Sequence, residues 1–272
     1  MTLISSLLHL TRWAFLALLI LTGCDSTTET EVHIDSGPRK FAARKAFSFE
    51  VDIAQQSRLR LEAVNGNVAI DGRPGVRSVT ITGERIVESS SLGDAEDHLD
   101  EVSVQVRDFS DEVFVRTIHP RNSQHRNYVV HYTITMPKDL ALEITHINGN
   151  LDVDTIENGV SIDHANGNVR LANVVGSARV KVVNGFINSD VTMPLDGVID
   201  MSTSNGNIDL AIPASTSATL SASVANGQIR TSNLALEDQS DSPRSLDGTL
   251  GEGEGTIDLK TLNGNINVTG QN

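Results

Sequence analysis

Short runs of alternating apolar and polar residues fill the second half of the chain, and most of them follow the dipeptide Asn-Gly. The triplets Leu151-Asp152-Val153, Val169-Arg170-Leu171 and Ile208-Asp209-Leu210 show this alternation. A period of two residues is typical of a strand with one buried face, and Asn-Gly readily adopts the positive φ angles of a tight turn. The pattern therefore predicts short strands separated by sharp corners.

The Asn-Gly corner recurs about every 20 residues, and a fixed period of this size is the mark of a solenoid. Six copies lie in the second half of the chain, and an earlier copy, Asn65-Gly66, stands apart. If successive turns stack in parallel at about 4.8 Å, the asparagine side chains can hydrogen-bond along the stack. The predicted turn ladder consists of Asn148, Gly149, Asn166, Gly167, Asn184, Gly185, Asn205, Gly206, Asn226, Gly227, Asn263 and Gly264.

The spacing predicts an all-β protein whose main part is a parallel β-solenoid, similar to a β-helix, of about seven to nine turns. The alternative is a β-sandwich, because Asn-Gly between two alternating runs is also a strong signal for an antiparallel hairpin. We favour parallel stacking because like residues follow each corner at nearly constant spacing.

The polar member of each triplet is expected to point outward and to form a row across the stacked strands. In chain order this row is Asp152, Arg170, Asn188, Asp209, Arg230 and Asn267. Sequential stacking predicts that Asp152–Arg170 and Asp209–Arg230 are neighbours, which stabilises a sheet by about 0.2–1 kcal/mol per pair. The row is interpreted as a solvated surface, with a carbohydrate- or ion-binding face as the alternative.

The chain divides into four segments. Residues 1–23 are interpreted as a signal peptide, 24–40 as a tether, 41–140 as a β-rich N-terminal section, and 141–272 as the repeated-coil solenoid. The long gap before Asn148 predicts an antiparallel excursion that caps the solenoid, with one short helix near residues 89–100. Residues 119–127 are expected to form a hairpin-like loop, and the polar residues 236–245 a mobile loop.

The N-terminus carries the signals of a bacterial lipoprotein. Arg12 precedes an apolar run of signal-peptide length, and this run ends in Leu21-Thr22-Gly23-Cys24. These four residues resemble a lipobox, in which Cys24 becomes the lipidated N-terminus and carries acyl chains such as palmitate. The resemblance implies attachment to a membrane of the cell envelope. Asp25 favours the periplasmic face of the inner membrane, and the outer membrane is the alternative.

Composition excludes several partners. The net charge of −14 is spread along the chain, and this disfavours nucleic acid and direct electrostatic docking on anionic lipid. Only 4% of the residues are aromatic, so a sugar-binding cleft of stacked aromatic rings is not expected. Cys24 is the single cysteine and has no disulfide partner within the chain.

Candidate chemistry is sparse. Parallel β-helices with catalytic activity place carboxylates on one face, and the candidate carboxylates of this chain are Asp152, Asp154, Asp163, Asp209 and Asp258. Asp152 and Asp154 share a face and permit a calcium site with Asp163. However, the chain contains neither the Asp-rich RTX nonapeptide nor the EF-hand loop, two known calcium-binding motifs. His119, His125 and His131 gather around one loop, whereas His146 and His164 occupy equivalent places before their corners and are interpreted as a packing repeat. No catalytic residue, metal or cofactor is assigned.

The order of several short sequence motifs along the chain resembles that of the bacterial putative-adhesin family. The resemblance covers roughly residues 45 to 270 and rests on Tyr132 to Asp139, the repeated Asn-Gly-Asn phrases, and Gly251 to Leu259 as a closing coil. It implies envelope-associated β-solenoid domains without a settled activity. The sequence thus predicts a lipid-anchored, adhesin-like binding or scaffolding protein of the envelope, with an envelope protein or a glycan as partner. The alternative is a carbohydrate-active lyase or hydrolase.

Overall fold

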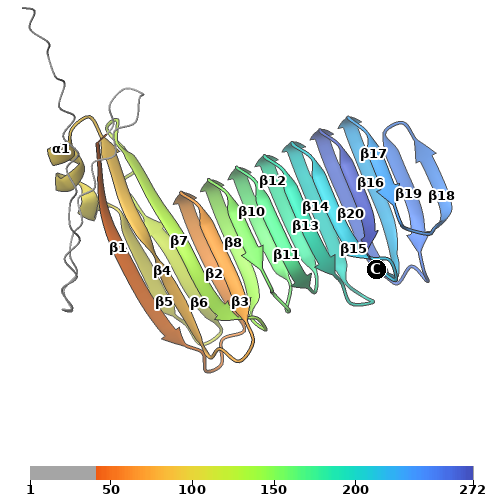
Figure 1. Cartoon of the computed structure of the whole chain (residues 1–272), viewed down its shortest axis with the longest axis horizontal. Coiled ribbons are helices and arrows are strands. Elements are labelled where there is room, and N and C mark those ends of the chain that lie inside the picture. Colours follow the sequence, from red (N-terminus) through yellow and green to blue (C-terminus); the bar gives the residue numbers. More distant parts are fainter. Residues whose placement is uncertain (1–40, 272) are drawn as a thin grey trace, which may run out of the picture.

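The computed structural model describes residues 41–271, and the predicted signal peptide, the predicted tether and Cys24 lie outside this range. The described chain is a flattened β-rod of two facing sheets (Figure 1). We call the ten-stranded sheet A and the eleven-stranded sheet B. No helix among the described residues is long and apolar enough to span a bilayer.

Sheet A contains, in spatial order, β1 (Phe41–Asp52), β4 (Ser78–Ser89), β7 (Asn127–Pro137), β3 (Val68–Arg73), β9 (Leu151–Asp154), β11 (Val169–Val175), β13 (Ile187–Thr192), β15 (Ile208–Pro213), β21 (Ile266–Gln271) and β17 (Ile229–Ser232). Sheet B contains β18 (Leu236–Ser242), β19 (Ser245–Leu250), β16 (Ala218–Asn226), β20 (Gly255–Asn263), β14 (Val198–Asn205), β12 (Ala178–Asn184), β10 (Val160–Asn166), β8 (Ala141–Asn148), β2 (Arg58–Asn65), β6 (Glu112–Ile118) and β5 (Ser103–Asp108).

The repeating unit, called a rung, is one strand of sheet B that passes through a corner into one strand of sheet A. Neighbouring rungs pair in parallel and in register, so Asn148, Asn166 and Asn184 lie side by side. This confirms the parallel solenoid and excludes the antiparallel sandwich. The rungs follow one another along the rod as β6–β7, β2–β3, β8–β9, β10–β11, β12–β13, β14–β15, β20–β21 and β16–β17.

The last coil of the chain is inserted into the stack. Strand β20 pairs in parallel with both β14 and β16, and β21 pairs with both β15 and β17. The expectation that Asp209 and Arg230 are neighbours was therefore wrong, because Asn267 lies between them in the register. The wide spacing before the last corner corresponds to this return of the chain.

The N-terminal excursion caps the other end of the rod. Strands β1, β4 and β7 pair antiparallel in sheet A, and β5 pairs antiparallel with β6 in sheet B. The expected short helix is present as α1 (Leu92–Asp97), followed by the 3-10 turn η1 (Leu99–Glu101). Ala95 and Leu99 are buried, and α1 packs against β1 and β4.

Two loop predictions were wrong. Residues 236–245 belong to the hairpin of β18 and β19, which pairs onto β16. This pairing satisfies backbone groups of an otherwise polar segment, and it buries Leu246 and Leu250. Residues 119–126 connect β6 in sheet B to β7 in sheet A, so they form a corner of the rod rather than a hairpin.

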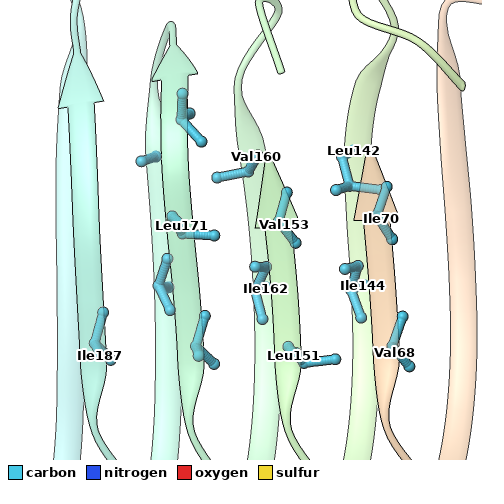
Figure 2. Close-up of a cluster of buried hydrophobic side chains, with 14 of the residues drawn as sticks. Val68, Ile70, Leu142, Ile144, Leu151, Val153, Val160, Ile162, Leu171 and Ile187 are labelled. Carbon is cyan, nitrogen blue, oxygen red and sulfur yellow. The ribbon is translucent and has the colours of Figure 1, made fainter. Parts of the chain in front are cut away.

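The core is a single layer of aliphatic side chains between the two sheets. Leu142 and Ile144 of sheet B and Leu151 and Val153 of sheet A are at most 2% exposed (Figure 2). Each such side chain contributes about 1.5–3 kcal/mol on full burial. The alternation in sequence therefore fixes which residues face inward, and every polar member of the triplets faces out.

Candidate functional site: the corners and the two outer faces

The corners bring the backbones of neighbouring rungs into close contact. Gly149, Gly167 and Gly185 have φ angles of +130°, +134° and +153°, which L side chains rarely adopt. A Cβ added at Gly167 would lie 2.0 Å from the carbonyl oxygen of Gly149. Neighbouring corners are therefore in direct backbone contact, and only glycine fits there.

The first asparagine of each corner forms a continuous side-chain ladder. Asn166 donates from Nδ2 to Oδ1 of Asn148 at 2.9 Å, and it accepts from Nδ2 of Asn184 at 2.8 Å. The ladder begins where Asn65 donates to the carbonyl oxygen of Tyr128 at 3.0 Å. Its members, in spatial order, are Asn65, Asn148, Asn166, Asn184, Asn205, Asn263 and Asn226.

A second ladder uses the residue after each corner glycine. The backbone N–H of Asn168 donates to Oδ1 of Asn150, and the N–H of Phe186 donates to Oδ1 of Asn168, each at 3.0 Å. Phe186 has no side-chain acceptor, so the ladder is interrupted between Phe186 and Asn207. It resumes where Asn265 donates to Oδ1 of Asn207 at 2.9 Å.

His146 and His164 stack beneath the corners, inside the core. Their rings are 4.9 Å apart and nearly parallel, with 5° between the planes. They are 2% and 3% exposed, and His164 Nδ1 contacts the carbonyl oxygen of His146 at 3.2 Å. Burial is the main cause that lowers the pKa of His146 to about 4, with repulsion from His164 second, and burial also lowers the pKa of His164.

The outer face of sheet A carries the polar row. In spatial order the row is Asp152, Arg170, Asn188, Asp209, Asn267 and Arg230. Arg170 donates to Asp152 at 2.8 Å, and both side chains are more than half exposed. Asn267 donates to Oδ1 of Asp209 at 2.6 Å. The row is therefore a hydrogen-bonded, solvated surface.

The five candidate carboxylates lie on different faces. Asp152, Asp154 and Asp209 lie in sheet A, whereas Asp163 and Asp258 lie in sheet B. Asp163 faces away from Asp154 on the opposite side of the rod, so a shared calcium site does not form. No group of three metal-ligating side chains occurs among residues 41–271.

Asp154 has the electrostatics of a structural carboxylate. It accepts a hydrogen bond from Asn173 and another from Thr155, each at 2.8 Å. The bond from Asn173 is the main cause that lowers the pKa of Asp154. A general acid needs the opposite shift.

The outer face of sheet B carries an apolar row that was not predicted from the sequence. We call it the corner stripe: in spatial order Ile118, Val64, Ile147, Ala165, Val183, Ser204, Leu262 and Ala225. All except Ile118, which ends β6, immediately precede a corner asparagine, and this regular position is the signal that reveals the row. Ile147, Val183 and Leu262 are 43%, 42% and 57% exposed.

Two shallow hollows lie along the corner stripe. The first, of about 490 Å³, has Val64, Ile118 and Ile147 among its lining residues. The second, of about 440 Å³, lies around Ser204 and Leu262. Neither is a deep cleft, so both are suited to contacts with side chains of a partner rather than to enclosing a substrate.

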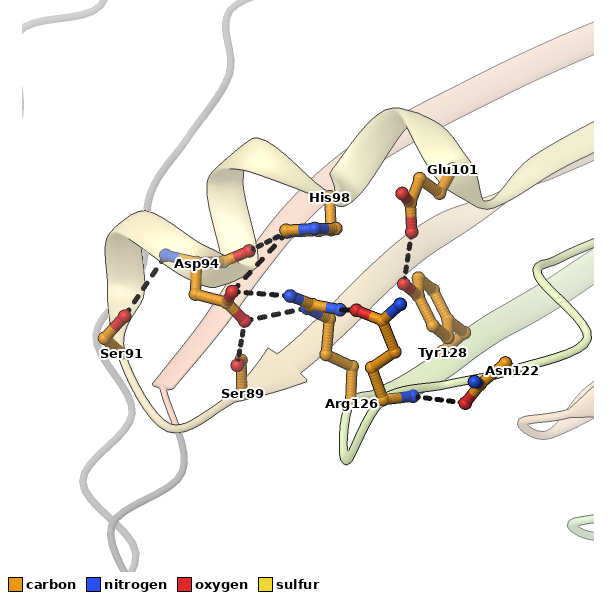
Figure 3. Close-up of polar contacts among 9 residues, drawn as sticks. Ser89, Ser91, Asp94, His98, Glu101, Asn122, Arg126 and Tyr128 are labelled. Carbon is orange, nitrogen blue, oxygen red and sulfur yellow. Dashed lines mark hydrogen bonds and ion pairs between the residues drawn. The ribbon is translucent and has the colours of Figure 1, made fainter.

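Helix α1 is held to the N-terminal cap by a polar cluster (Figure 3). Arg126 donates to both carboxylate oxygens of Asp94, at 2.8 and 2.7 Å, and Ser89 donates to the same carboxylate. The bond from Arg126 is the main cause that holds the pKa of Asp94 well below its usual range. Ser91 caps the helix by accepting from the Asp94 N–H at 3.2 Å. Every member of this cluster has a hydrogen-bond partner. The cluster therefore attaches the connection of residues 119–126 to helix α1.

Solved structures of low identity are similar to this chain. A putative cell adhesion protein from Clostridium sporogenes has 15% identity and a TM-score of 0.46, over 84% of this chain and 100% of that chain. A putative adhesin from Bacteroides fragilis has 13% identity and a TM-score of 0.29, over 82% and 97%. A putative lipid binding protein from Parabacteroides distasonis has 11% identity and a TM-score of 0.22, over 82% and 96%. No curated protein matches the chain.

The family comparison covers most of the described structure. The pattern of the Toastrack DUF4097 family matches residues 51–269, from the end of β1 to the last strand. This match confirms the resemblance inferred from the Asn-Gly phrases and the closing coil. With its parallel rungs, its glycine corners and its two outer faces, the chain belongs to the Toastrack DUF4097 family.

Proposed function

We propose that this protein is a binding or scaffolding protein of the bacterial cell envelope, adhesin-like in action, whose outer sheet A face engages a glycan. The observation that carries this proposal is the polar row, in which donors and acceptors recur at the rung spacing of about 4.8 Å on an exposed face. A chain polymer with hydroxyl groups fits such a row because each rung offers another hydrogen bond. A flat polar surface suits many weak contacts better than one enclosed site.

The proposal includes a lipid anchor at Cys24. It is supported by the four-residue lipobox and by the apolar leader before it. Several acyl chains hold a protein on a membrane stably, since each buried CH₂ contributes about 0.8 kcal/mol. Labelling of cells with a fatty acid analogue should mark the protein, and Cys24→Ser should lose the label. An unlabelled protein in both cases would remove the anchor from the proposal.

Binding to a panel of immobilised envelope polysaccharides tests the role of the polar row. An Arg170→Ala/Asp209→Ala variant should lose binding, because it removes two side chains that lie on the same face of sheet A, separated only by the Asn188 strand. Arg179→Ala is the matched control, since Arg179 is an exposed residue of β12 in sheet B. Equal binding by both variants, or no binding to any glycan, contradicts the proposal, and a crosslinked envelope protein at the polar row would then identify the other class of partner.

The same panel separates binding from catalysis. Depolymerisation of a polysaccharide that is lost in Asp152→Ala or Asp209→Ala would identify a carbohydrate-active enzyme in place of a binding protein. We expect intact polymer in every case, because Asp152 is held by Arg170 and Asp209 by Asn267 as members of the polar row.

A further inference from the structure

The corner stripe has a second row of side chains beside it on sheet B. These residues lie two positions before the stripe on each strand, so they share its outward direction. We call them the flanking row: in spatial order Arg116, Glu62, Thr145, Asp163, Lys181, Ser202, Lys260 and Ser223. An apolar row with a charged rim is the anatomy of a protein–protein contact.

The order of residues in these two rows is compatible with a two-fold axis between two copies of the chain. Two rods that face each other through sheet B and run in opposite directions are related by an axis along the strands. If this axis passes between the rungs β10–β11 and β12–β13, each row faces its own copy in reversed order. Within each row, the first residue of one copy then meets the eighth residue of the other copy, the second meets the seventh, the third meets the sixth, and the fourth meets the fifth. Such a contact is isologous, which is the commonest symmetry of protein dimers.

Reversal of the corner stripe places its two isoleucines opposite small residues. Ile147 faces Ser204 of the second copy, and Ile118 faces Ala225 of the second copy. Ser204 lies in the second hollow, between the exposed Val183 and Leu262 strands. In the same arrangement Leu262, which is 57% exposed, enters the first hollow over Val64 of the second copy. Each hollow therefore receives the projecting side chain of the other molecule.

Reversal of the flanking row places opposite charges together. Asp163 meets Lys181 of the second copy twice around the axis. Glu62 also lies opposite Lys260 of the second copy, although within each chain Glu62 is paired with Arg116 and Lys260 with Asp258. Within one chain Asp163 and Lys181 are exposed register partners, yet the described structure shows no salt bridge at either of them. One row further from the corner, Glu143 would face Asp200, so the contact is confined to the two rows nearest the corners.

We propose that two copies of this chain associate as an antiparallel dimer through the corner stripe and the flanking row of sheet B. The proposal goes beyond the glycan-binding role, since it uses the other outer face and leaves the polar row of sheet A free in both copies. Its occupant is a second copy rather than an unrelated partner, because both the size pattern and the charge pattern are complementary to themselves under one operation.

Charge reversal at the axis tests the dimer. The full-length chain in mild detergent is studied by sedimentation velocity over about 1 to 100 µM, the range of moderate protein affinities. The wild type should sediment as a dimer at the upper end. Asp163→Lys alone places four positive charges at the axis, and Lys181→Asp alone places four negative charges there, so each variant should be monomeric. An equimolar mixture of the two variants should recover the dimer, because both pairs of residues 163 and 181 across the axis are then opposite in sign.

Recovery of the dimer on mixing is specific to the proposed arrangement, because it requires residues 163 and 181 to meet across two chains. Leu262→Asp should also give a monomer, whereas Leu195→Asp should remain dimeric, since Leu195 is an equally exposed leucine outside the stripe. Circular dichroism confirms that each variant is folded before its mass is interpreted. A monomeric wild type, or a mixture that stays monomeric, overturns the proposal.

Discussion

At the scale of single residues, the protein tolerates two buried histidines because they remain neutral. A charged imidazole in this core would have no counter-ion, since the residues paired with His146 and His164 in the sheet are Ala63 and Val182. Neutral rings instead stack on each other and fill the space beneath the glycine corners. The histidines therefore act as core residues whose fit depends on pH.

Stability should fall as the pH is lowered from about 6.5 to about 4. The folded pKa of His146 is about 4, below the ordinary value of about 6.5. The stabilising effect of the neutral ring is thus complete above pH 6.5 and is lost as the pH falls through the folded pKa. The loss should reach about 3 kcal/mol for His146, and His164 acts in the same direction. Urea unfolding at a series of pH values measures this loss of unfolding free energy.

A His146→Leu/His164→Leu variant should show a flatter profile over this range. The exposed His125→Asn variant is the control and should keep the wild-type slope, because His125 lies on the corner loop outside the core. A wild type whose unfolding free energy is constant between pH 6.5 and pH 4 would contradict this account of the pair.

At the scale of the element, each corner is a turn that is completed only by its neighbours. The glycine supplies the positive φ angle, the first asparagine bonds to the same residue of the next rung, and the third residue accepts a backbone N–H. An isolated corner has none of these inter-rung bonds. The corner is thus stable as part of a stack, which is how solenoid repeats generally derive their stability.

Phe186→Asn should stabilise the protein. Within the described residues no acceptor is present for the backbone N–H of Asn207, whereas equivalent N–H groups of Asn150, Asn168 and Asn265 each have an asparagine oxygen. Asparagine at position 186 would supply the missing Oδ1 and remove an aromatic ring that is 52% exposed. One added hydrogen bond is worth about 0.5–1.5 kcal/mol. The shift of the urea midpoint measures the gain.

Phe186→Ala is the matched control for this substitution. It removes the same ring without providing an acceptor, so it should leave the midpoint at or below the wild-type value. If Phe186→Asn and Phe186→Ala shift the midpoint equally, the interrupted ladder has no bearing on stability.

At the scale of the whole molecule, the order of rungs differs from the order of the sequence. The last coil, β20 and β21, lies between two rungs that precede it in the chain, while the β18–β19 hairpin, which lies beyond β16, caps sheet B. The last strand is thus an internal part of the rod.

A chain that ends at Gly251 should lose far more than its last coil. The truncation leaves β14 and β16 without their shared partner, and it exposes core residues on both sides of the gap. Replacement of Leu236–Leu250 by a short Gly-Ser linker is the control, because β18 and β19 form an end cap whose first and last residues are paired. Hydrogen exchange should show lost protection in β14 for the truncation alone, because β16 loses a paired strand in both variants. Equal protection of β14 in both variants would count against an internal role.

The sequence by itself determined the parallel stack, the inward and outward faces, the short helix and the place of the corner contacts. It did so because alternation and the Asn-Gly turn are local properties, and identical turns at constant spacing can be satisfied only by stacking. It did not determine which rungs are neighbours. All corners offer the same hydrogen bonds, so Asn205 can stack on Asn226 or on Asn263, and only the tertiary structure placed Asn263 between them. The pairing of Asp209 with Asn267 and the position of the β18–β19 hairpin follow from that order and from contacts between distant segments, which no local pattern specifies.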